Sequence, residues 1–341
     1  MKVLTFVIPA YNSENYLDKC ISSMLLEEVL SELEIIVVND GSTDKTADIA
    51  EKYCTQYPET VRLISQENKG HGGALNTGCA AARGKYLKVI DADDWIVSEN
   101  LQDFIALLKQ CNSDVVLTHH HTIDISTGEV RNWKSYPPEL GKSSTFDEIM
   151  ADWNRYNRSL SLHGITYRRD FYQEFGTALS EHVFYEDYEY ATFPCCLAKS
   201  IMPFDLFLYE YRIGDANQSV SSANQLKRIG HTETVLRNMA EKYHRLPESA
   251  GKRYAAMKIQ ELLLSYFTTV LLVEPDKRKG RAQATKIMSE FGAFCPEVYS
   301  LALRKYQIFL LMNRLHISKQ AWSRLITSRI YTMLTRKKSF D

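Results

Sequence analysis

The sequence predicts an α/β fold in which a mostly parallel sheet carries helices on both faces, followed by a mostly helical region. In the N-terminal part, short runs of β-branched and aromatic residues alternate with segments of helical periodicity. The first of these runs, residues 3–8, is continuous and apolar, which is typical of a strand buried on both faces. From Gln225 onward no convincing strand run occurs, and apolar residues recur at helical spacing.

The first predicted strand is the continuous apolar run 3–8, and Pro9 ends it because proline has no N–H to donate. Asn12 or Ser13 caps a predicted helix over 14–30, where apolar residues recur three or four apart. Apolar runs closed by polar residues then alternate with helical segments. These runs predict strands over 34–39, 61–64 and 86–90, and helices from about 44, over 74–83 and over 98–111.

The middle of the chain continues the alternation. Residues 114–121 form a predicted strand, and a turn at Thr127-Gly128 joins it to 129–133 as a hairpin. A helix begins near Glu186, and Pro194 is expected to kink or split it. The remaining predicted elements are helices over 146–157 and 169–175 and strands over 162–167 and 201–211.

Three adjacent histidines continue the strand that begins at Asp114: His119, His120 and His121. Successive strand residues point to opposite faces, so at most two of the three could share one ligand. We favour the interpretation that the three histidines are partly exposed polar strand residues near the active site. The alternative is that they form a second metal site.

Length and composition limit the class of protein. The 341 residues suggest two domains of ~150 residues each, and we place them at 1–222 and 223–341. A net charge of −1 gives no global signal for a polyanion, and no reader motif is present, so we expect no nucleic-acid partner. The seven cysteines lack C-x-x-C spacing, so we expect reduced thiols, as in a cytoplasmic protein. Met1-Lys2 leads straight into a predicted strand, so we expect no signal peptide. The apolar run 262–273 is shorter than the ~20 residues of a membrane span, so we expect a buried core helix there.

Three carboxylates follow the predicted strand 86–90 within four residues: Asp91, Asp93 and Asp94. Crowded carboxylates repel one another and need a compensating positive charge. A divalent cation bridged to phosphate supplies it, since Mg²⁺ typically takes one or two carboxylates plus substrate phosphates. We therefore interpret Asp91 and Asp93 as the metal and nucleotide end of an active site. The alternative is an acidic turn that caps the following helix.

Two further loops are expected at the same place. Tyr11 follows the first predicted strand and Asp40 follows the second. Parallel strands end at one edge of their sheet, where ligands of open α/β sheets bind. The convergence of Tyr11, Asp40 and Asp91 predicts one composite site.

Two later segments each allow two interpretations. Asp187, with Glu186, stands either as an acid favoured at a helix start or as a general base that deprotonates an incoming hydroxyl. Arg212 opens a polar, glycine-bearing loop, which is either a plain surface loop or a cover over a bound phosphate with Arg212 as its charged contact.

The C-terminal end is strongly basic. Between Tyr299 and Asp341 the only acid is Asp341, and apolar residues fall three or four apart beside nine basic ones. This pattern is typical of a helix lying in an anionic membrane surface, and we favour it over a helix packed on the body of the protein. The apolar stripe consists of Trp322, Leu325, Ile326, Ile330, Met333 and Leu334.

Four segments together resemble the family 2 glycosyltransferases, whose GT-A fold is a Rossmann-like sheet with helices on both faces. In the family's order and spacing, they are Phe6-Val7-Ile8-Pro9-Ala10-Tyr11-Asn12, residues 34–44, Asn68-Lys69-Gly70 and Asp91-Ala92-Asp93-Asp94. The resemblance covers about residues 2–95 and extends toward 222. It implies inverting transfer of a sugar from a nucleotide diphosphosugar, favouring a UDP-sugar, to a hydroxyl of a growing surface polysaccharide or lipid-linked glycan.

The resemblance also assigns roles to residues. Asp187 matches the family's catalytic base, and Asp93, with Asp91, would coordinate Mg²⁺ or Mn²⁺ that bridges the diphosphate. One departure is Asn39, which stands where the family usually has the first of two acids before Gly41. The implied nucleotide-binding residues are Pro9, Ala10, Tyr11, Glu14, Asp40, Lys69, Gly70, Asp91, Ala92 and Arg212.

Other functions remain open on the sequence. A phosphohydrolase or nucleotidyltransferase could use Asp91 and Asp93, and a non-catalytic nucleotide-sugar-binding protein would suit the helical region. For the transferase we expect a cytoplasmic location, peripheral on the inner face of the cell membrane.

Overall fold

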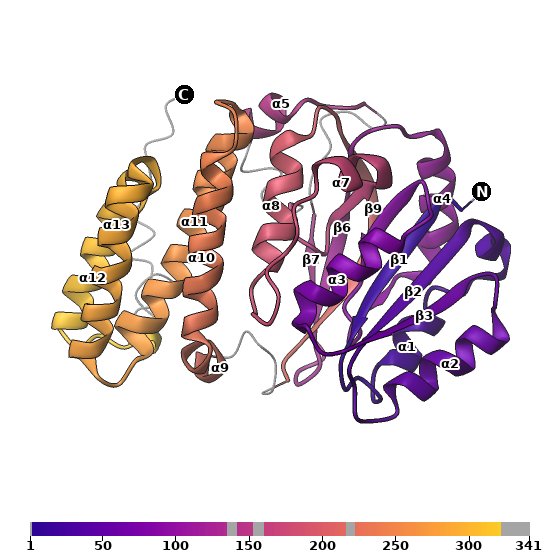
Figure 1. The fold of residues 1–341 in the computed structure, drawn as a ribbon, viewed down its shortest axis with the longest axis horizontal. Coiled ribbons are helices and arrows are strands. Elements are labelled where there is room, and N and C mark those ends of the chain that lie inside the picture. Colours follow the sequence, from indigo (N-terminus) through magenta and orange to yellow (C-terminus); the bar gives the residue numbers. More distant parts are fainter. Residues whose placement is uncertain (1, 135–141, 153–159, 216–221, 322–341) are drawn as a thin grey trace. The chain divides into compact units, whose positions relative to one another are not determined.

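The computed structural model describes residues 2–134, 142–152, 160–215 and 222–321 (Figure 1). The chain divides into two compact units. The first comprises residues 1–218 together with 242–255, and the second comprises 219–241 together with 256–341. The predicted domain boundary at residue 222 stays a prediction, because compact packing does not by itself establish independent domains.

Four parallel strands form the N-terminal half of the sheet in the first unit. They are β1 (Leu4–Ala10), β2 (Leu33–Asp40), β3 (Val61–Gln66) and β4 (Tyr86–Val89), in the order β3-β2-β1-β4. Every residue of β1, β2 and β4 is buried, as the apolar runs predict. Pro9 does not end β1, however, because it pairs with Val38 inside the ladder and the strand continues to Ala10.

The remaining strands make the sheet mixed. Beyond β4 the order continues β8-β6-β9-β5, with β8 (Ile165–Arg168) antiparallel to both of its neighbours. The long strand β9 (Ile201–Ile213) runs parallel to β6 (Val115–Asp124) and pairs with β5 (Trp95–Ile96). The predicted hairpin is confirmed, because β7 (Val130–Trp133) pairs antiparallel with β6.

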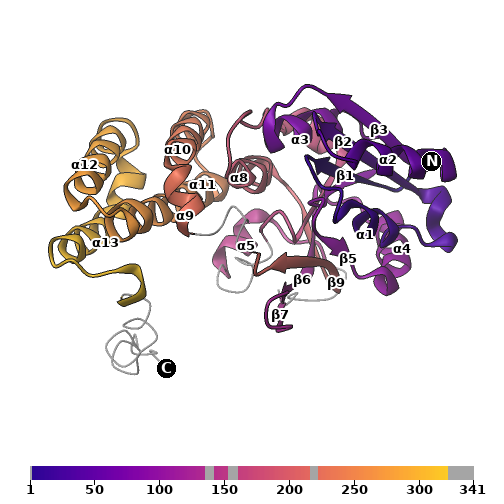
Figure 2. The same ribbon diagram turned by 90° about the horizontal axis from the view of Figure 1, so that it is seen from below.

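Helices cover both faces of this sheet, with α3 (Gly70–Ala81) on one face and α1 (Leu17–Ser22) and α4 (Leu101–Gln110) on the other (Figure 2). The predicted helix over 14–30 is wrong in length. Only α1 (Leu17–Ser22) forms, and the 3₁₀ turn Glu27–Glu32 follows it. Asn12 and Ser13 do not cap α1. Asn12 Oδ1 accepts the Thr43 N–H from the loop after β2, and the Ser13 N–H donates to Thr46 Oγ1 at the start of the next helix. The other helices up to β6 are α2 (Thr46–Gln56), α3 (Gly70–Ala81), the 3₁₀ turn Ser98–Asn100 and α4 (Leu101–Gln110).

Three helices of the middle region follow the prediction with local differences. They are α5 (Phe146–Ala151), α7 (Arg169–Phe175) and α8 (Asp187–Leu197). Pro194 does not split α8, which continues through it as one element. The part of the predicted helix 146–157 beyond residue 152 lies outside the described residues.

The C-terminal region is helical in its described residues, as predicted. Its elements are α9 (Ser222–Lys227), α10 (Ile229–His244), α11 (Ala250–Phe267), a π-helical turn Thr268–Val273, α12 (Lys277–Phe294) and α13 (Pro296–Arg314). The apolar run 262–273 ends a longer helical segment, Ala250–Val273, which is long and apolar enough to span a membrane by length and composition alone. Because 61% of that segment's most apolar window is buried, a core helix fits it equally well. The apolar stripe predicted from Trp322 onward lies outside the described residues.

Candidate active site

The loops after β1 and β2 are tied together at the edge where these strands and β4 end, here called the carboxyl edge. Asn12 adopts a left-handed conformation (φ 48°), and its Oδ1 accepts the Thr43 N–H at 2.9 Å. Glu14 Oε2 accepts the Lys45 N–H at 3.1 Å. Tyr11, at the tip of the first loop, is 52% exposed. Glu14 therefore joins the two loops, and its predicted contact with a nucleotide stays a prediction.

Asp40 ends β2 as a buried, oriented acceptor with 2% exposure. Its Oδ1 accepts the Gln66 Nε2–H at 2.7 Å and the Lys69 N–H at 2.9 Å. Within the described part of the chain both bonds end on Oδ1, which leaves Oδ2 for a ligand. Lys69 and Gly70 therefore lie beside Asp40, and their predicted contact with a nucleotide stays a prediction.

The acids after β4 are organised by Tyr209 of β9. The Tyr209 hydroxyl donates to Asp94 Oδ2 at 2.6 Å, and its oxygen accepts the Asp91 N–H at 3.1 Å. The Arg212 N–H donates to Asp94 Oδ1 at 2.7 Å. Burial, together with the charges of Asp91 and Asp93, raises the pKa of Asp94 well above its ordinary value. Asp94 is thus the structural centre of the acidic turn.

Arg212, near the end of β9, lies beside the acids after β4, and Asp93 is one of its partners. Its predicted contact with a bound phosphate stays a prediction. Its Nη1 lies 3.4 Å from Asp93 Oδ2, and its Nη2 donates to Asp215 Oδ2 at 2.9 Å. The guanidinium carbon lies 4.4 Å from the centre of the Tyr16 ring. A buried arginine with several acidic partners gives the carboxyl edge a fixed positive group beside its carboxylates.

One group of side chains in the described residues has the spacing of a metal site. Ligand atoms of Asp91, Asp94 and His163 all lie within 4.8 Å of one another. Burial lowers the pKa of His163 to about 4, so its imidazole is neutral near pH 7, as metal ligation requires. Two carboxylates and a neutral imidazole are a donor set that fits a divalent cation such as Mn²⁺. Asp93 is outside this group, so its predicted metal role stays a prediction.

His71 connects the acidic turn to the start of α8. Its Nδ1–H donates to Glu186 Oε1 at 2.5 Å, and its Nε2–H donates to Asp91 Oδ1 at 3.0 Å. Burial alone would lower the pKa of His71, but the carboxylates of Glu186 and Asp91 raise it well above its usual value. For Asp91, burial opposes ionisation, but the hydrogen bond and charge of His71 still lower its pKa.

Asp187 is exposed at the first position of α8, next to Glu186. Burial raises the pKa of Tyr211, and the carboxylates of Asp94, Asp91, Asp187 and Asp93 raise it further. The Tyr211 ring in turn stacks on His163, with the ring centres 4.2 Å apart. Asp187 therefore shares one electrostatic neighbourhood with the acids after β4.

Comparisons with known proteins identify the family and the fold of the chain. The family model for glycosyl transferase family 2 matches residues 5–176, which is just over half of the chain. The chain belongs to glycosyl transferase family 2. The resemblance carried by the four sequence segments is thereby confirmed.

Among its family 2 relatives, the uncharacterized glycosyltransferase EpsJ of Bacillus subtilis is 40% identical over 114 residues, covering 33% of this chain and 33% of that protein. Glycosyltransferase GlyA of Streptococcus pneumoniae is 33% identical, covering 37% of this chain and 18% of that protein. The chain thus spans a third or less of these two relatives. The uncharacterized glycosyltransferase YibD of Escherichia coli is 29% identical over 74% of this chain and 72% of that protein.

A solved structure shows the same fold. Residues 1–349 of Staphylococcus aureus TarS, in complex with UDP-GlcNAc, superpose with a TM-score of 0.65 at 22% identity. The match covers 93% of this chain and 88% of that chain. The predicted GT-A-like sheet with a helical C-terminal region is therefore confirmed.

Sequence reasoning missed three residues of this candidate site: His71, His163 and Tyr209. A signal was available only for His71, which stands among Gly70, Gly72 and Gly73, and crowded glycines indicate a close approach of backbones. His163 and Tyr209 come from strands or loops far along the chain from the acids, and no spacing rule links them.

The three adjacent histidines of β6 point to alternating faces, as predicted. His119 donates from Nε2 to Asp205 Oδ1 at 2.8 Å, whereas His120 stacks on Trp133 on the other face. The expectation that all three are partly exposed is wrong, because His119 and His120 are 1% and 6% exposed. Burial lowers the pKa of His120 to about 2, so it packs as a neutral ring.

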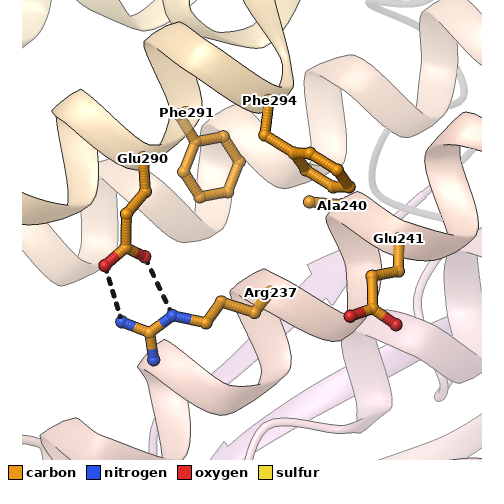
Figure 3. A pocket seen from close by; sticks show the side chains of 6 residues that line it. All are labelled: Arg237, Ala240, Glu241, Glu290, Phe291 and Phe294. Carbon is orange, nitrogen blue, oxygen red and sulfur yellow. Dashed lines mark hydrogen bonds and ion pairs between the residues drawn. The ribbon is translucent and has the colours of Figure 1, made fainter.

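A separate pocket of about 250 Å³ lies in the second unit (Figure 3). Phe291 and Phe294 line one side of it, and Arg237 lies opposite them. Arg237 is already neutralised, since its Nε donates to Glu290 Oε2 at 2.9 Å. None of the predicted site residues lines this pocket, so we assign no part of the family 2 chemistry to it.

Proposed function

We propose that this chain is an inverting glycosyltransferase that transfers a sugar from a nucleotide diphosphosugar, favouring a UDP-sugar, to a hydroxyl acceptor. One observation carries the proposal. Asp91, Asp93 and Asp94 gather at the carboxyl edge beside Arg212, and Asp187 lies in the same electrostatic neighbourhood. The TarS structure, which holds UDP-GlcNAc, supports a uridine donor.

The base and ribose would bind over the loops after β1 and β2. Asp40 offers its Oδ2 to a ring N–H of a pyrimidine, and the exposed Tyr11 ring offers a stacking surface. We also propose that the other residues implied by the sequence resemblance contact the nucleotide. They are Pro9, Ala10, Glu14, Lys69, Gly70, Asp91, Ala92 and Arg212.

A divalent cation, Mn²⁺ or Mg²⁺, is the proposed cofactor. Asp91 and Asp93 are its predicted ligands, and the grouping of Asp91 with Asp94 and His163 supports a metal at this position. When bound, the cation would neutralise charge on the departing diphosphate. Arg212 supplies a further fixed positive charge from the protein itself.

Asp187 is the proposed general base. As the acceptor oxygen bonds to the anomeric carbon, the bond from that carbon to the diphosphate oxygen breaks, and the hydroxyl proton passes to the Asp187 carboxylate. A single displacement of this kind inverts the anomeric centre. Exposure of Asp187 leaves it accessible to an acceptor that enters from solvent.

We also propose a cytoplasmic protein that is peripheral on the inner face of the cell membrane, with a lipid-linked glycan or growing polysaccharide as acceptor. On α13 and at the residue that caps its C-terminus, four large apolar side chains are exposed, and their separations of seven, three and four residues are compatible with one helix face. They are Leu301, Ile308, Leu311 and Leu315. Arg304, Lys305 and Arg314 are exposed on the same helix, which suits anionic lipid.

Cosedimentation of the full chain with vesicles tests the membrane proposal. Binding should require anionic lipid and should fall when Leu311→Gln and Leu315→Gln are combined. Val130→Gln, which changes an exposed apolar residue of β7, is the matched control. Equal binding by the double variant and the control would reject a role for this face of α13.

The transferase proposal is tested by a donor screen that measures nucleotide release from a panel of activated sugars. A thermal-shift series complements it, with UDP plus Mn²⁺, UDP alone and GDP plus Mn²⁺. We expect stabilisation that needs both the metal and the pyrimidine diphosphate. Release from no donor, together with no metal-dependent shift, would reject the proposal.

A further inference from the structure

His71 occupies a position between two parts of the proposed site that no sequence motif connects. It lies in the first turn of α3, and its imidazole reaches Asp91 on one side and Glu186 on the other, at 3.0 and 2.5 Å. The Nε2 atom faces Asp91 Oδ1 and the Nδ1 atom faces Glu186 Oε1, so both ring nitrogens are engaged. The ring is therefore fully occupied by these two partners.

Glycines around His71 allow this contact. A Cβ on Gly72 would lie 2.3 Å from the Ser180 carbonyl oxygen and 2.8 Å from Glu186 Cγ. Gly70 has φ +77°, and the Lys69 carbonyl accepts the His182 N–H at 2.7 Å. The first turn of α3 is thus pressed directly against residues 180–186, which is the segment that leads into α8.

Glu186 depends on His71 for its orientation. The carboxylate is buried, with the residue 2% exposed, and His71 supplies its one side-chain hydrogen bond within the described residues. The other oxygen, Oε2, is buried without a hydrogen-bond partner there. Because Asp187 follows Glu186 directly, a shift of Glu186 moves the first residue of α8.

We propose that His71 is a positioning residue that couples the donor end of the site, at Asp91, to the base end, at Asp187. The inference rests on the proposed function, in which these ends serve the leaving group and the attacking hydroxyl. In this scheme His71 touches neither the leaving group nor the attacking hydroxyl. It fixes the distance between Asp91 and Asp187, and displacements of about 1 Å at a reacting centre can cost roughly 10²-fold in rate.

Two variants with graded loss test the coupling. His71→Ala removes both hydrogen bonds, whereas His71→Gln keeps a single side-chain donor for one of them. We expect kcat to fall in the order wild type, His71→Gln, His71→Ala, by about 10²-fold for the last, with the donor KM and UDP affinity within a few-fold. The matched control is His182→Asn, an exposed histidine whose φ of 57° suits asparagine; its kcat should stay within about two-fold of wild type.

A double-mutant cycle separates positioning from a merely structural effect. If His71 acts through Asp187, His71→Ala should cost little further rate in the Asp187→Asn background. Thermal unfolding of each variant identifies those that fold, and Glu186→Gln supplies a second disruption of the same bridge. The inference would be overturned if the rate losses of His71→Ala and Asp187→Asn simply add in the double variant. It would also be overturned if His71→Ala raises the donor KM and leaves kcat unchanged.

The two proposals fail in different ways. If wild-type protein transfers no sugar from any donor, the proposed function fails and takes this inference with it. If wild type transfers sugar and His71→Ala matches it in kcat, only the role of His71 is rejected.

Discussion

The hydroxyl of Tyr209 donates to Asp94 at 2.6 Å and accepts the N–H of Asp91 at 3.1 Å. One side chain from β9 therefore sets the shape of the acidic turn after β4. The pairing of Trp95 with Glu210 between β5 and β9 brings these distant segments together. The acids at the carboxyl edge consequently depend on a strand that lies more than one hundred residues later in the chain.

Tyr209→Phe should destabilise the protein and weaken metal-dependent nucleotide binding. It leaves buried Asp94 with one partner fewer and the Asp91 N–H without one, at a cost of about 1–3 kcal/mol. Urea unfolding measures the loss in the free energy of unfolding. Tyr11→Phe, at an exposed ring, is the control and should change stability by less than about 0.5 kcal/mol. A Tyr209→Phe protein as stable as the control would show that the hydroxyl does not organise the turn.

Asp187→Asn should keep nucleotide affinity within a few-fold and lose transfer by about 10²–10⁴-fold. The amide preserves the shape of the side chain but cannot take the acceptor's proton. Calorimetric titration with UDP and a transfer assay with labelled donor measure the two effects separately. Transfer at the wild-type rate would eliminate Asp187 as the base.

Asp93→Asn should abolish the stabilisation by UDP that requires Mn²⁺, if Asp93 contacts the cation. Asp215→Asn is the matched control, because Asp215 is another carboxylate paired with Arg212. Thermal shifts across a Mn²⁺ series compare the two variants. An equal loss in both would indicate that the Arg212 network, rather than metal ligation by Asp93, is responsible.

Lys88 gives stability a pH dependence with a defined sign. Its ammonium is buried on β4 and donates to the carbonyl oxygens of His163 and Ile165, and burial lowers its pKa from 10.5 to about 7. Between these two values the unfolded chain binds one proton more than the folded chain, so the free energy of unfolding should rise with pH. Below about pH 7 both states hold the proton, and Lys88 adds no slope.

Lys88→Met should remove this slope. Urea unfolding of both proteins from about pH 7 to 9.5 gives the difference, which should approach 1.4 kcal/mol per pH unit in mid-window. Other titrating groups contribute equally to the two proteins and cancel. Parallel pH curves would mean that Lys88 is not buried with a lowered pKa.

Gly72→Ala should destabilise the protein because its Cβ would meet the Ser180 backbone oxygen at 2.3 Å. We expect a loss of about 1–3 kcal/mol in the free energy of unfolding, with reduced transfer. Gly230→Ala, in helix α10, is the control, since a Cβ there meets nothing within 4 Å. That control should be neutral or slightly stabilising, as alanine favours helix. Similar stability of the two variants would rule out close packing at Gly72.

Local patterns predicted those parts of the fold that depend on local chemistry. The runs in β1, β2 and β4 are apolar because both of their faces are buried, and Asp40 and Asp91 come where each run stops. The predicted start of helix 14–30 was wrong because Asn12 and Ser13, which look like caps, bond instead to Thr43 in the loop after β2 and to Thr46 at the start of α2. The alternation of His119, His120 and His121 was predictable from strand geometry. Their burial was not, since it depends on residues of the paired strands β9 and β7.

By itself the sequence determined the family, the parallel strands and the acids that end them, because strand period and polar breaks are properties of neighbouring residues. Only the tertiary structure decided that His71 joins Asp91 to Glu186, that Tyr209 supports Asp94 and that His163 lies near both acids. The physical reason is that periodicity reports which face of its own element a residue occupies. Which residue of another element meets that face depends on the packing of α3, α8 and β9 in three dimensions.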